Sequence, residues 1–356
     1  MKSIFKTGFI VALLAIASTS FAGNKDRAGQ AGAGQLLINP WARSSGWAGA
    51  NSASVTGLEA TYTNIAGLAF TPKTELVLSN TSWFTGSGIN ILSFGLAQRV
   101  SETSVLGLSI QSMNFGDIDI VTEENPEGGI GTFSPKLTTI NLGFAKEFSN
   151  SIYGGFGAKV ISEGISNAKA SGIAFDMGVR YVTGENDNIK FGIALKNVGP
   201  KMRYSGDGFS YTTSIDDEEF TVEWRTEAFE LPALLNIGGS YDYYVGESID
   251  SVSGDVKSMH RVTAAGNFTS NSFGKDQIRF GLEYGFKQLI MIRAGYLYEQ
   301  GVFSAASITT FNVGPTAGLT FQIPLNKKGS SLDIDYAYRA TRPMGGNHSI
   351  GIRVNL

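Results

Sequence analysis

The stretch DQIRFGLEYGFK, from Asp276 to Lys287, decides the fold class. Large apolar side chains occupy its even positions, and the odd positions between them carry only charge or glycine. Strict alternation of this kind predicts a β-strand with one apolar and one polar face. In a soluble sheet such an apolar face lies on a core and the polar face meets water. Here the apolar side chains are Ile278, Phe280, Leu282, Tyr284 and Phe286.

The same pattern recurs from Pro72 to the end of the chain, in runs that turn residues separate. Transmembrane barrels need strands of ~9–11 residues, whereas soluble strands have a mode of ~5–6 residues. Most of the runs have the longer size, and there are about fourteen of them, an even number. The predicted strands are 74–84, 88–100, 103–116, 136–149, 151–163, 170–183, 188–198, 231–244, 257–268, 276–287, 289–299, 308–322, 331–340 and 346–356.

The connections between the runs give an independent test. Transmembrane barrels have short periplasmic turns and longer extracellular loops. If the N-terminal part of the chain lies on the periplasmic side, the connections after odd-numbered strands face outward. The two longest connections, 117–135 and 199–230, follow this rule. One connection does not: VGESIDSVSGDV (245–256) would be a long connection on the inner side.

The apolar strand faces need a cover, and the sequence shows no helices that could provide one. Lipid is the simplest cover, with the small and charged faces turned into a lumen, and a closed sheet satisfies every backbone group. The predicted fold class is therefore all-β, a transmembrane antiparallel β-barrel of about fourteen strands over residues 74–356. The alternative is a soluble exported sandwich or a lipid-binding shell.

The N-terminus predicts export. Lys2 and Lys6 precede the apolar run FIVALLAIA (9–17), and Ser20-Phe21-Ala22 offers a cleavage site of small residues. We interpret residues 1–22 as a signal peptide; a retained anchor is the alternative, although the run is short for a membrane span. Together with the barrel pattern, this predicts a multi-pass protein of the cell outer membrane, with the lipid bilayer as a partner.

Residues 23–73 form a distinct head that is rich in small residues and lacks clean alternation. The charges predicted to face the lumen have both signs, whereas an ion-selective pore usually favours one sign. We therefore expect the head to form a plug, or hatch, held in the lumen by ion pairs and close packing; a wet lumen is the alternative. The predicted lumen charges are Asp176, Arg180, Arg279, Glu283, Arg293, Asp333, Asp335 and Arg339.

The chain lacks the residue patterns of an enzyme. Its 28 Lys+Arg and 31 Asp+Glu give a net charge of -3, without the basic balance of a nucleic-acid-binding protein. It has no cysteine and only two histidines, His260 and His348, each near or in a predicted strand. Asp117-x-Asp119 and the acidic run 216–219 lack the spacing of an EF-hand and are better explained as solvated loop tips. No catalytic residue, cofactor or metal is predicted.

The connection 199–230 combines acidic residues with four aromatic ones, Phe209, Tyr211, Phe220 and Trp224. Exposed aromatic side chains beside charge are typical of a protein-binding surface. The alternative is a loop that folds back onto the mouth of the barrel.

Four stretches resemble the PorV/PorQ family of outer-membrane barrels, which is related to the FadL fatty-acid transporters. ARSSGWAGA (42–50) is similar to the family's A-R-x-x-G-M-G-G-A, and NIAGL (64–68) to its N-P-A-G-L. KNVGPKMRYSGDG (196–208) with Leu231-Pro232, and GLEYGFKQLIMIRAGYLYE (281–299), resemble later family segments. The resemblance covers residue 35 to the end, and its plug motif carries over to Arg43, Gly46, Asn64 and Gly67. Trp47, Ile65 and Leu356 depart from the family's usual Met, Pro and terminal aromatic residue.

The resemblance implies a non-enzymatic subunit of the type IX protein secretion system. Its partners would be other outer-membrane proteins of the secretion complex and the C-terminal signal domains of cargo proteins. Two alternatives stay open: FadL-like transport of hydrophobic small molecules, and an accessory role in another outer-membrane assembly or export complex.

Overall fold

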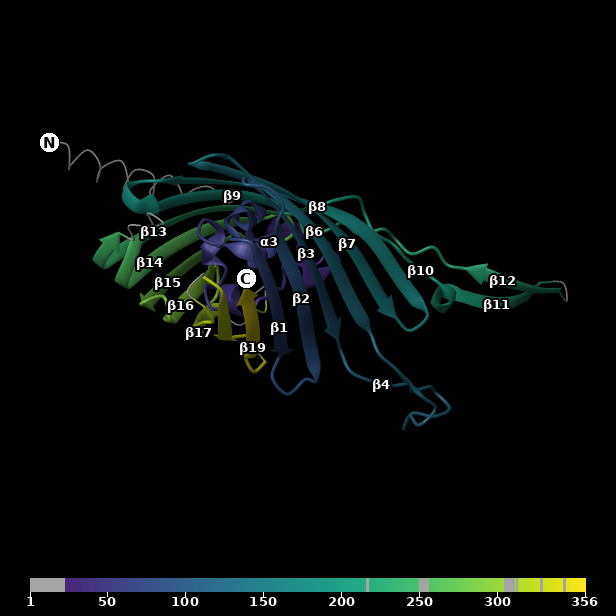
Figure 1. Cartoon of the computed structure of the whole chain (residues 1–356). Helices are drawn as coiled ribbons and strands as arrows, with labels where there is room; N and C mark the ends of the chain where they lie inside the picture. Colours follow the sequence, from purple (N-terminus) through teal and green to yellow (C-terminus); the bar gives the residue numbers. More distant parts are fainter. Residues whose placement is uncertain are drawn as a thin grey trace.

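The computed structural model describes residues 23–215, 218–249, 256–303, 311, 313–326, 329–341 and 344–356. In this part of the chain, fourteen long antiparallel strands pair in chain order (Figure 1), and β19 (Asn347–Asn355) returns to β1 (Thr74–Trp83). The predicted fold class is confirmed. The other barrel strands are β2 (Ile89–Arg99), β3 (Ser104–Asn114), β6 (Lys136–Ser149), β7 (Ile152–Ile165), β8 (Ala168–Thr183), β9 (Ile189–Val198), β13 (Leu234–Ile249), β14 (Val256–Asn271), β15 (Gln277–Phe286), β16 (Ile290–Glu299), β17 (Gly314–Pro324) and β18 (Ser331–Arg339).

The alternating pattern separates two environments. On β15 the even-numbered side chains point outward, and Phe280 and Leu282 are 59% and 57% exposed. The charged Glu283 on the same strand is buried inside the barrel. The other strands repeat this arrangement, so that the outer surface is an apolar belt and the lumen is polar, as in transmembrane barrels. No helix in the described residues has the length and apolar character of a membrane span.

The long connections gather at one end of the barrel, which we call the outer side. They are 115–135, 199–233 and 300–313, whereas 100–103, 150–151 and 287–289 at the inner side are short. The predicted long inner connection is wrong. β13 and β14 stay paired as far as Ile249 and Val256, with a break in the register at Gly246. Only residues 250–255 remain between them, and they lie outside the described residues.

Two small sheets project beyond the outer rim (Figure 1). The first connection contains β4 (Ile118–Asp119) paired with β5 (Thr132–Phe133). The second contains the short β10 (Tyr204–Ser205), which pairs with β8, then η7 (Asp207–Phe209) and a hairpin of β11 (Ser210–Ile215) and β12 (Glu218–Glu223). The hairpin therefore projects away from the mouth, whereas Met202 and Phe229 at the base of the connection 199–230 pack against the head.

The head crosses the lumen from the outer side to the inner side. Asn24 N donates to Asn271 O (3.4 Å) at the outer mouth, and the segment ends at Thr74, where β1 begins at the inner side. Short helical turns form most of its path: η1 (Lys25–Arg27), η2 (Gly34–Leu37), α2 (Ala42–Ser45), η3 (Ala50–Ser52), η4 (Gly57–Glu59), α3 (Ala60–Thr63) and η5 (Ile65–Phe70). A further turn, η6 (Glu185–Asp187), joins β8 to β9.

Glycines on the inner face of the barrel let the head approach closely. A Cβ at Gly281 would lie 2.6 Å from Trp47 Cε3, and one at Gly318 would lie 3.1 Å from Gly46 Cα. Real Cβ atoms do not approach other atoms as closely as 2.6 Å. The glycines that alternate with apolar residues in the strands are therefore the contact surface for the head.

Candidate ligand-binding cavity

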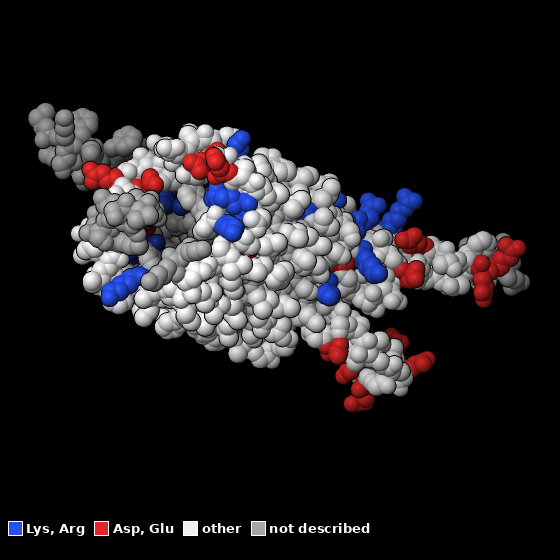
Figure 2. Space-filling view, in the orientation of Figure 1, with Lys and Arg blue, Asp and Glu red and all other residues white. Residues whose placement is uncertain are grey.

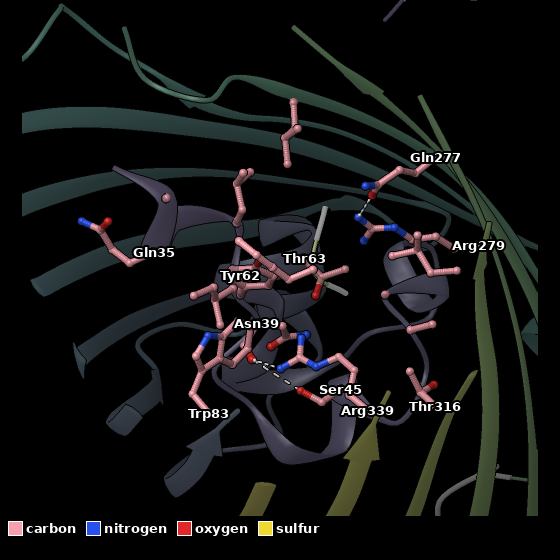
Figure 3. Close-up of a pocket in the computed structure, with 18 of the residues that line it drawn as sticks. Gln35, Asn39, Ser45, Tyr62, Thr63, Trp83, Gln277, Arg279, Thr316 and Arg339 are labelled. Atoms are coloured by element: carbon pink, nitrogen blue, oxygen red, sulfur yellow. Dashed lines mark hydrogen bonds between the residues drawn. The ribbon is translucent and has the colours of Figure 1, made fainter. Parts of the chain in front are cut away.

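A cavity of about 430 Å³ lies between the head and the outer half of the barrel wall (Figure 3). The head contributes residues from Gly34 to Asn39 and from Ser45 to Thr63, and the wall contributes residues from strands that include β1, β9, β15 and β18. Ligand pockets usually have volumes of roughly 300–1,000 Å³. The cavity is therefore large enough for a small organic molecule.

One side of the cavity is apolar and aromatic. The Trp83 and Phe84 rings lie with their centroids 5.0 Å apart, and Phe84 meets Phe311 edge-on at 5.4 Å. Trp83 packs in one cluster with Ile38 from the head and Ile91 and Met113 from the wall. These residues stand near the outer ends of β1, β2 and β3, so the apolar side faces the outer mouth.

Three cations lie around the phenol of Tyr62 in the same cavity, and one of them, Arg339, also lies 5.4 Å from the centroid of the Trp83 ring. Lys196 Nζ lies 3.8 Å from the centroid of the Tyr62 ring. Arg279 Nη2 donates to Gln277 Oε1 (2.7 Å), and Arg339 Nη2 donates to Asn39 O (3.2 Å; Figure 3). Burial raises the pKa of Tyr62 despite the opposing effect of both arginines, so its hydroxyl keeps its proton. The charged residues that line the cavity are all cations.

A second cavity of about 400 Å³ lies on the inner side of the head. Its lining has both signs of charge, with Arg43, Lys190 and Arg293 beside Glu59 and Asp242. The two cavities are separated by the segment Ser45–Ala50: Ser45, Ala48 and Gly49 line the outer one, and Trp47 lines the inner one. This segment thus forms a thin partition across the lumen.

The predicted plug-motif residue Arg43 meets two of the predicted lumen charges. Its guanidinium donates to Asp333 Oδ2 (2.8 Å) and Asp335 Oδ1 (3.0 Å) on β18. The two aspartates are buried. A neighbouring pair, Arg353 with Glu59, again joins a wall strand to the head. These contacts are ion pairs between the head and the barrel wall.

The remaining predicted lumen charges divide into two groups. Glu283 pairs with Arg293, and Asp176 pairs with Lys159. Three cations make no ion pair within the described residues: Arg180, Arg279 and Arg339. Arg180 instead donates to Val55 O (2.6 Å) and stacks over the Phe70 ring, with its carbon Cζ 4.1 Å from the centroid.

The other three plug-motif residues shape the head. Asn64 caps η5, with its Oδ1 accepting from Ala66 N (3.2 Å), and its Nδ2 donates to Val179 O on the wall (3.2 Å). Gly67 leaves no room for a side chain, because a Cβ there would lie 2.3 Å from Val55 O. Gly46 contacts Gly318 on β17 backbone to backbone.

The four predicted partner-loop aromatics lie on the projecting hairpin, away from the cavity. Register pairs Tyr211 with Val222, and Phe220 with Thr213. Because side chains alternate across a strand, these residues share one face with Trp224, which is 67% exposed. Phe209 lies in η7 at the start of the hairpin and bonds to Trp224 through the backbone. No group of three or more potential metal ligands occurs in the part of the chain described above.

The sequence did not single out Tyr62, Lys196 or Trp83 as site residues. Tyr62 lies in the head, where no periodicity shows which way a side chain points. Lys196 belongs to a strand whose alternation places it inward with Ala194, and this alone could have identified it as a lumen charge. Trp83 ends β1 on the inward side, and its partners come from segments that only the closed barrel brings together.

Comparison with known proteins adds information on the fold. The sequence matches no family model and no curated protein. The CymD monoaromatic hydrocarbon channel is similar in structure, with a TM-score of 0.51, 13% identity, and coverage of 89% of this chain and 97% of that chain. The Pseudomonas putida toluene transporter TodX has a TM-score of 0.50, 13% identity, and coverage of 85% and 94%.

What these proteins share is the fold. The similarity extends to a Pseudomonas aeruginosa FadL homologue, with a TM-score of 0.48, 11% identity, and coverage of 89% and 96%. At 13% identity, the likeness to CymD and TodX shows a shared barrel fold and nothing further. None of the comparisons supports membership of the PorV/PorQ family.

Proposed function

We propose that this chain is a non-enzymatic outer-membrane barrel that takes up a hydrophobic small molecule through its lumen. The observation that carries the proposal is the outer cavity, which is lined both by aromatic side chains and by the hydrogen-bonding groups of Tyr62, Arg279 and Arg339. Two solved structures with a similar fold are named as a monoaromatic hydrocarbon channel and a toluene transporter, which supports the same class of cargo.

The cavity suits a molecule with a dominant apolar part. Trp83, Phe84 and Met113 offer aromatic and sulfur surfaces that gain free energy by removing apolar area from water. In the same cavity Tyr62 and Arg279 offer hydrogen bonds to a polar group. Release toward the periplasm would then require the partition Ser45–Ala50 to move, because it separates this cavity from the inner one.

Gly34 offers a direct test, because it lines the cavity and a Cβ there would meet nothing within 4 Å. We expect the indole of Gly34→Trp to fill the cavity, whereas Gly34→Ala should leave it open. The assay is the rate at which N-phenyl-1-naphthylamine enters Gram-negative host cells that carry the barrel in their outer membrane. We expect wild type and Gly34→Ala to accelerate entry over barrel-free cells, and Gly34→Trp to abolish the gain. Equal entry with and without the barrel would reject the function.

The projecting hairpin favours a second candidate, partner binding in a type IX secretion complex. Tyr211, Phe220 and Trp224 expose 46%, 44% and 67% of their surface on one face, and such a face is typical of a protein-binding site. The comparisons offer this role no support, so the hairpin alone carries it. Replacing the three residues by serine should abolish crosslinks to proteins of the secretion complex and impair cargo secretion. Unchanged crosslinks and secretion would reject this candidate.

A further inference from the structure

The barrel wall carries a band of exposed cations at its outer rim, confined to neighbouring strands. Lys136 on β6 and Lys169 on β8 point outward, and Arg203 is exposed just before Tyr204 of β10. Figure 2 shows basic side chains at the rim from which the hairpin projects, while acidic side chains lie on the projections. Lys201, two residues before Arg203, forms an ion pair with Glu230 (3.3 Å).

Strand register places these cations side by side. Lys136 lies opposite Gly164 of β7, and Gly164 lies opposite Lys169 of β8. Two strand spacings of ~4.8 Å put the two lysine backbones about 10 Å apart. On the far side of β8, Lys169 lies opposite Ser205 of β10. Arg203 precedes Ser205 by two residues, so it belongs to the same outward face.

The outward face below this row changes in layers. The next row toward the inner side carries hydroxyls, with Thr138, Ser162 and Ser171 in register. The row after that is apolar and exposed, with Ile140, Val160 and Ile173 at 40%, 51% and 46%. A succession of apolar, hydroxyl and basic rows matches the change from hydrocarbon to lipid headgroup at a membrane interface.

No acidic partner within the described residues accounts for the three cations. Lys136, Lys169 and Arg203 make no ion pair within the described residues, and neither Glu163 nor Tyr204 reaches them, because those two side chains bond to each other on the inward face. Gly164, which lies between the two lysines on the same outward face, leaves open space, since a Cβ there would meet only Lys136 O, at 3.9 Å. The rim thus presents a shallow, positively charged site with a gap between two lysines.

We propose that this rim binds the phosphate groups of a phosphorylated glycolipid in the outer leaflet. Lys136 and Lys169 would flank one phosphate over Gly164, and Arg203 would contact a second phosphate or the same one from the β10 side. The hydroxyl row would meet the sugar backbone, and the apolar rows would meet the acyl chains. This site lies on the outside of the wall and is independent of what passes through the lumen.

Native mass spectrometry of the purified barrel can test the site with diphosphoryl lipid A as the probe. A cation near a membrane surface contributes about 1 kcal/mol, or roughly fivefold in affinity. Lys169→Gln should therefore weaken binding about fivefold, and the triple change K136Q/K169Q/R203Q should weaken it by more than tenfold. Lys146→Gln is the matched control, because Lys146 lies exposed on the same face of β6 at its inner end. It should bind like wild type.

Two further probes identify the source of the phosphate. Dephosphorylated lipid A with the same acyl chains should bind weakly to wild type, and inorganic phosphate at equal concentration should not displace diphosphoryl lipid A. Undiminished binding by the triple variant, or equal binding of dephosphorylated lipid A, would overturn the proposal. Displacement by inorganic phosphate would show that a lipid is not the source of the bound phosphate. If the triple variant fails to fold, Lys169→Gln against Lys169→Arg decides: only the arginine variant should keep wild-type affinity.

Discussion

Replacing Arg43 by methionine should loosen the head from the barrel. The guanidinium of Arg43 reaches two carboxylates, at 2.8 Å and 3.0 Å, and both aspartates are only 1% exposed. Removal of one partner from a buried ion pair costs about 3–5 kcal/mol, because the remaining charge stays buried without compensation. Ser331 and Thr320 still donate to Asp333 and Asp335. We therefore expect a loss near the lower bound, about 3 kcal/mol.

Tryptophan fluorescence during urea unfolding in detergent micelles measures this loss. Trp41 and Trp47 are buried in the head and report its release, and a Trp224→Phe background removes the signal of the exposed hairpin. The matched control is Arg27→Gln, in the same head. Its ion pair with Glu230 is 35% and 38% exposed, and pairs of this kind contribute about 0–1 kcal/mol.

A double-mutant cycle separates the ion pair from other effects of the methionine. In R43M/D335N one of the two stranded charges is absent, so the double variant should lose less stability than the two single variants together, by about 1 kcal/mol or more. If Arg43→Met costs no more than Arg27→Gln, buried ion pairs do not hold the head, and the reasoning fails.

Three further changes test other parts of the structure. Gly281→Val should cost about 1–3 kcal/mol of unfolding free energy by overpacking against Trp47, whereas Gly285→Val on the same strand, with neighbours only at 3.9 Å, should cost much less in the same urea titration. Trp47→Ala should join the two cavities and raise ion conductance in planar bilayers, while Trp41→Ala, which lines neither cavity, should not; equal conductance would contradict the partition. Leu142→Arg on the outer face should cost about 2–4 kcal/mol in lipid-folding titrations, and a neutral result would place Leu142 outside the hydrocarbon.

The barrel strands could be predicted because the alternation within each strand shows by itself which side chains face outward and which face the lumen. Phe280 and Glu283 show their environments through alternation alone, without knowledge of their neighbours. The connection after β13 was misjudged for a related reason. Its Gly246 and Glu247 interrupt the alternation and so suggested a loop, but backbone pairing as far as Ile249 and Val256 extends both strands.

The cavity and the path of the head could not be predicted in the same way. The head has short helical turns and small residues, so no period shows which side chains face the wall. Arg43 and Asp335 lie 292 residues apart and meet only because the sheet closes. The hairpin β11–β12 was missed as an element because acidic residues interrupt the alternation that starts at Phe209 and Tyr211.

A membrane-spanning barrel requires its apolar belt to face hydrocarbon, and spin-label accessibility along β2 tests this directly. The chain has no cysteine, so each introduced cysteine is a unique labelling site. Leu92 and Phe94 are 54% and 50% exposed, whereas Ser93 between them is buried. In reconstituted bilayers, labels at 92 and 94 should collide often with oxygen and rarely with a water-soluble nickel chelate, and a label at 93 should be protected from both. Labels at 92 and 94 that collide mainly with the nickel chelate would contradict the membrane-spanning barrel.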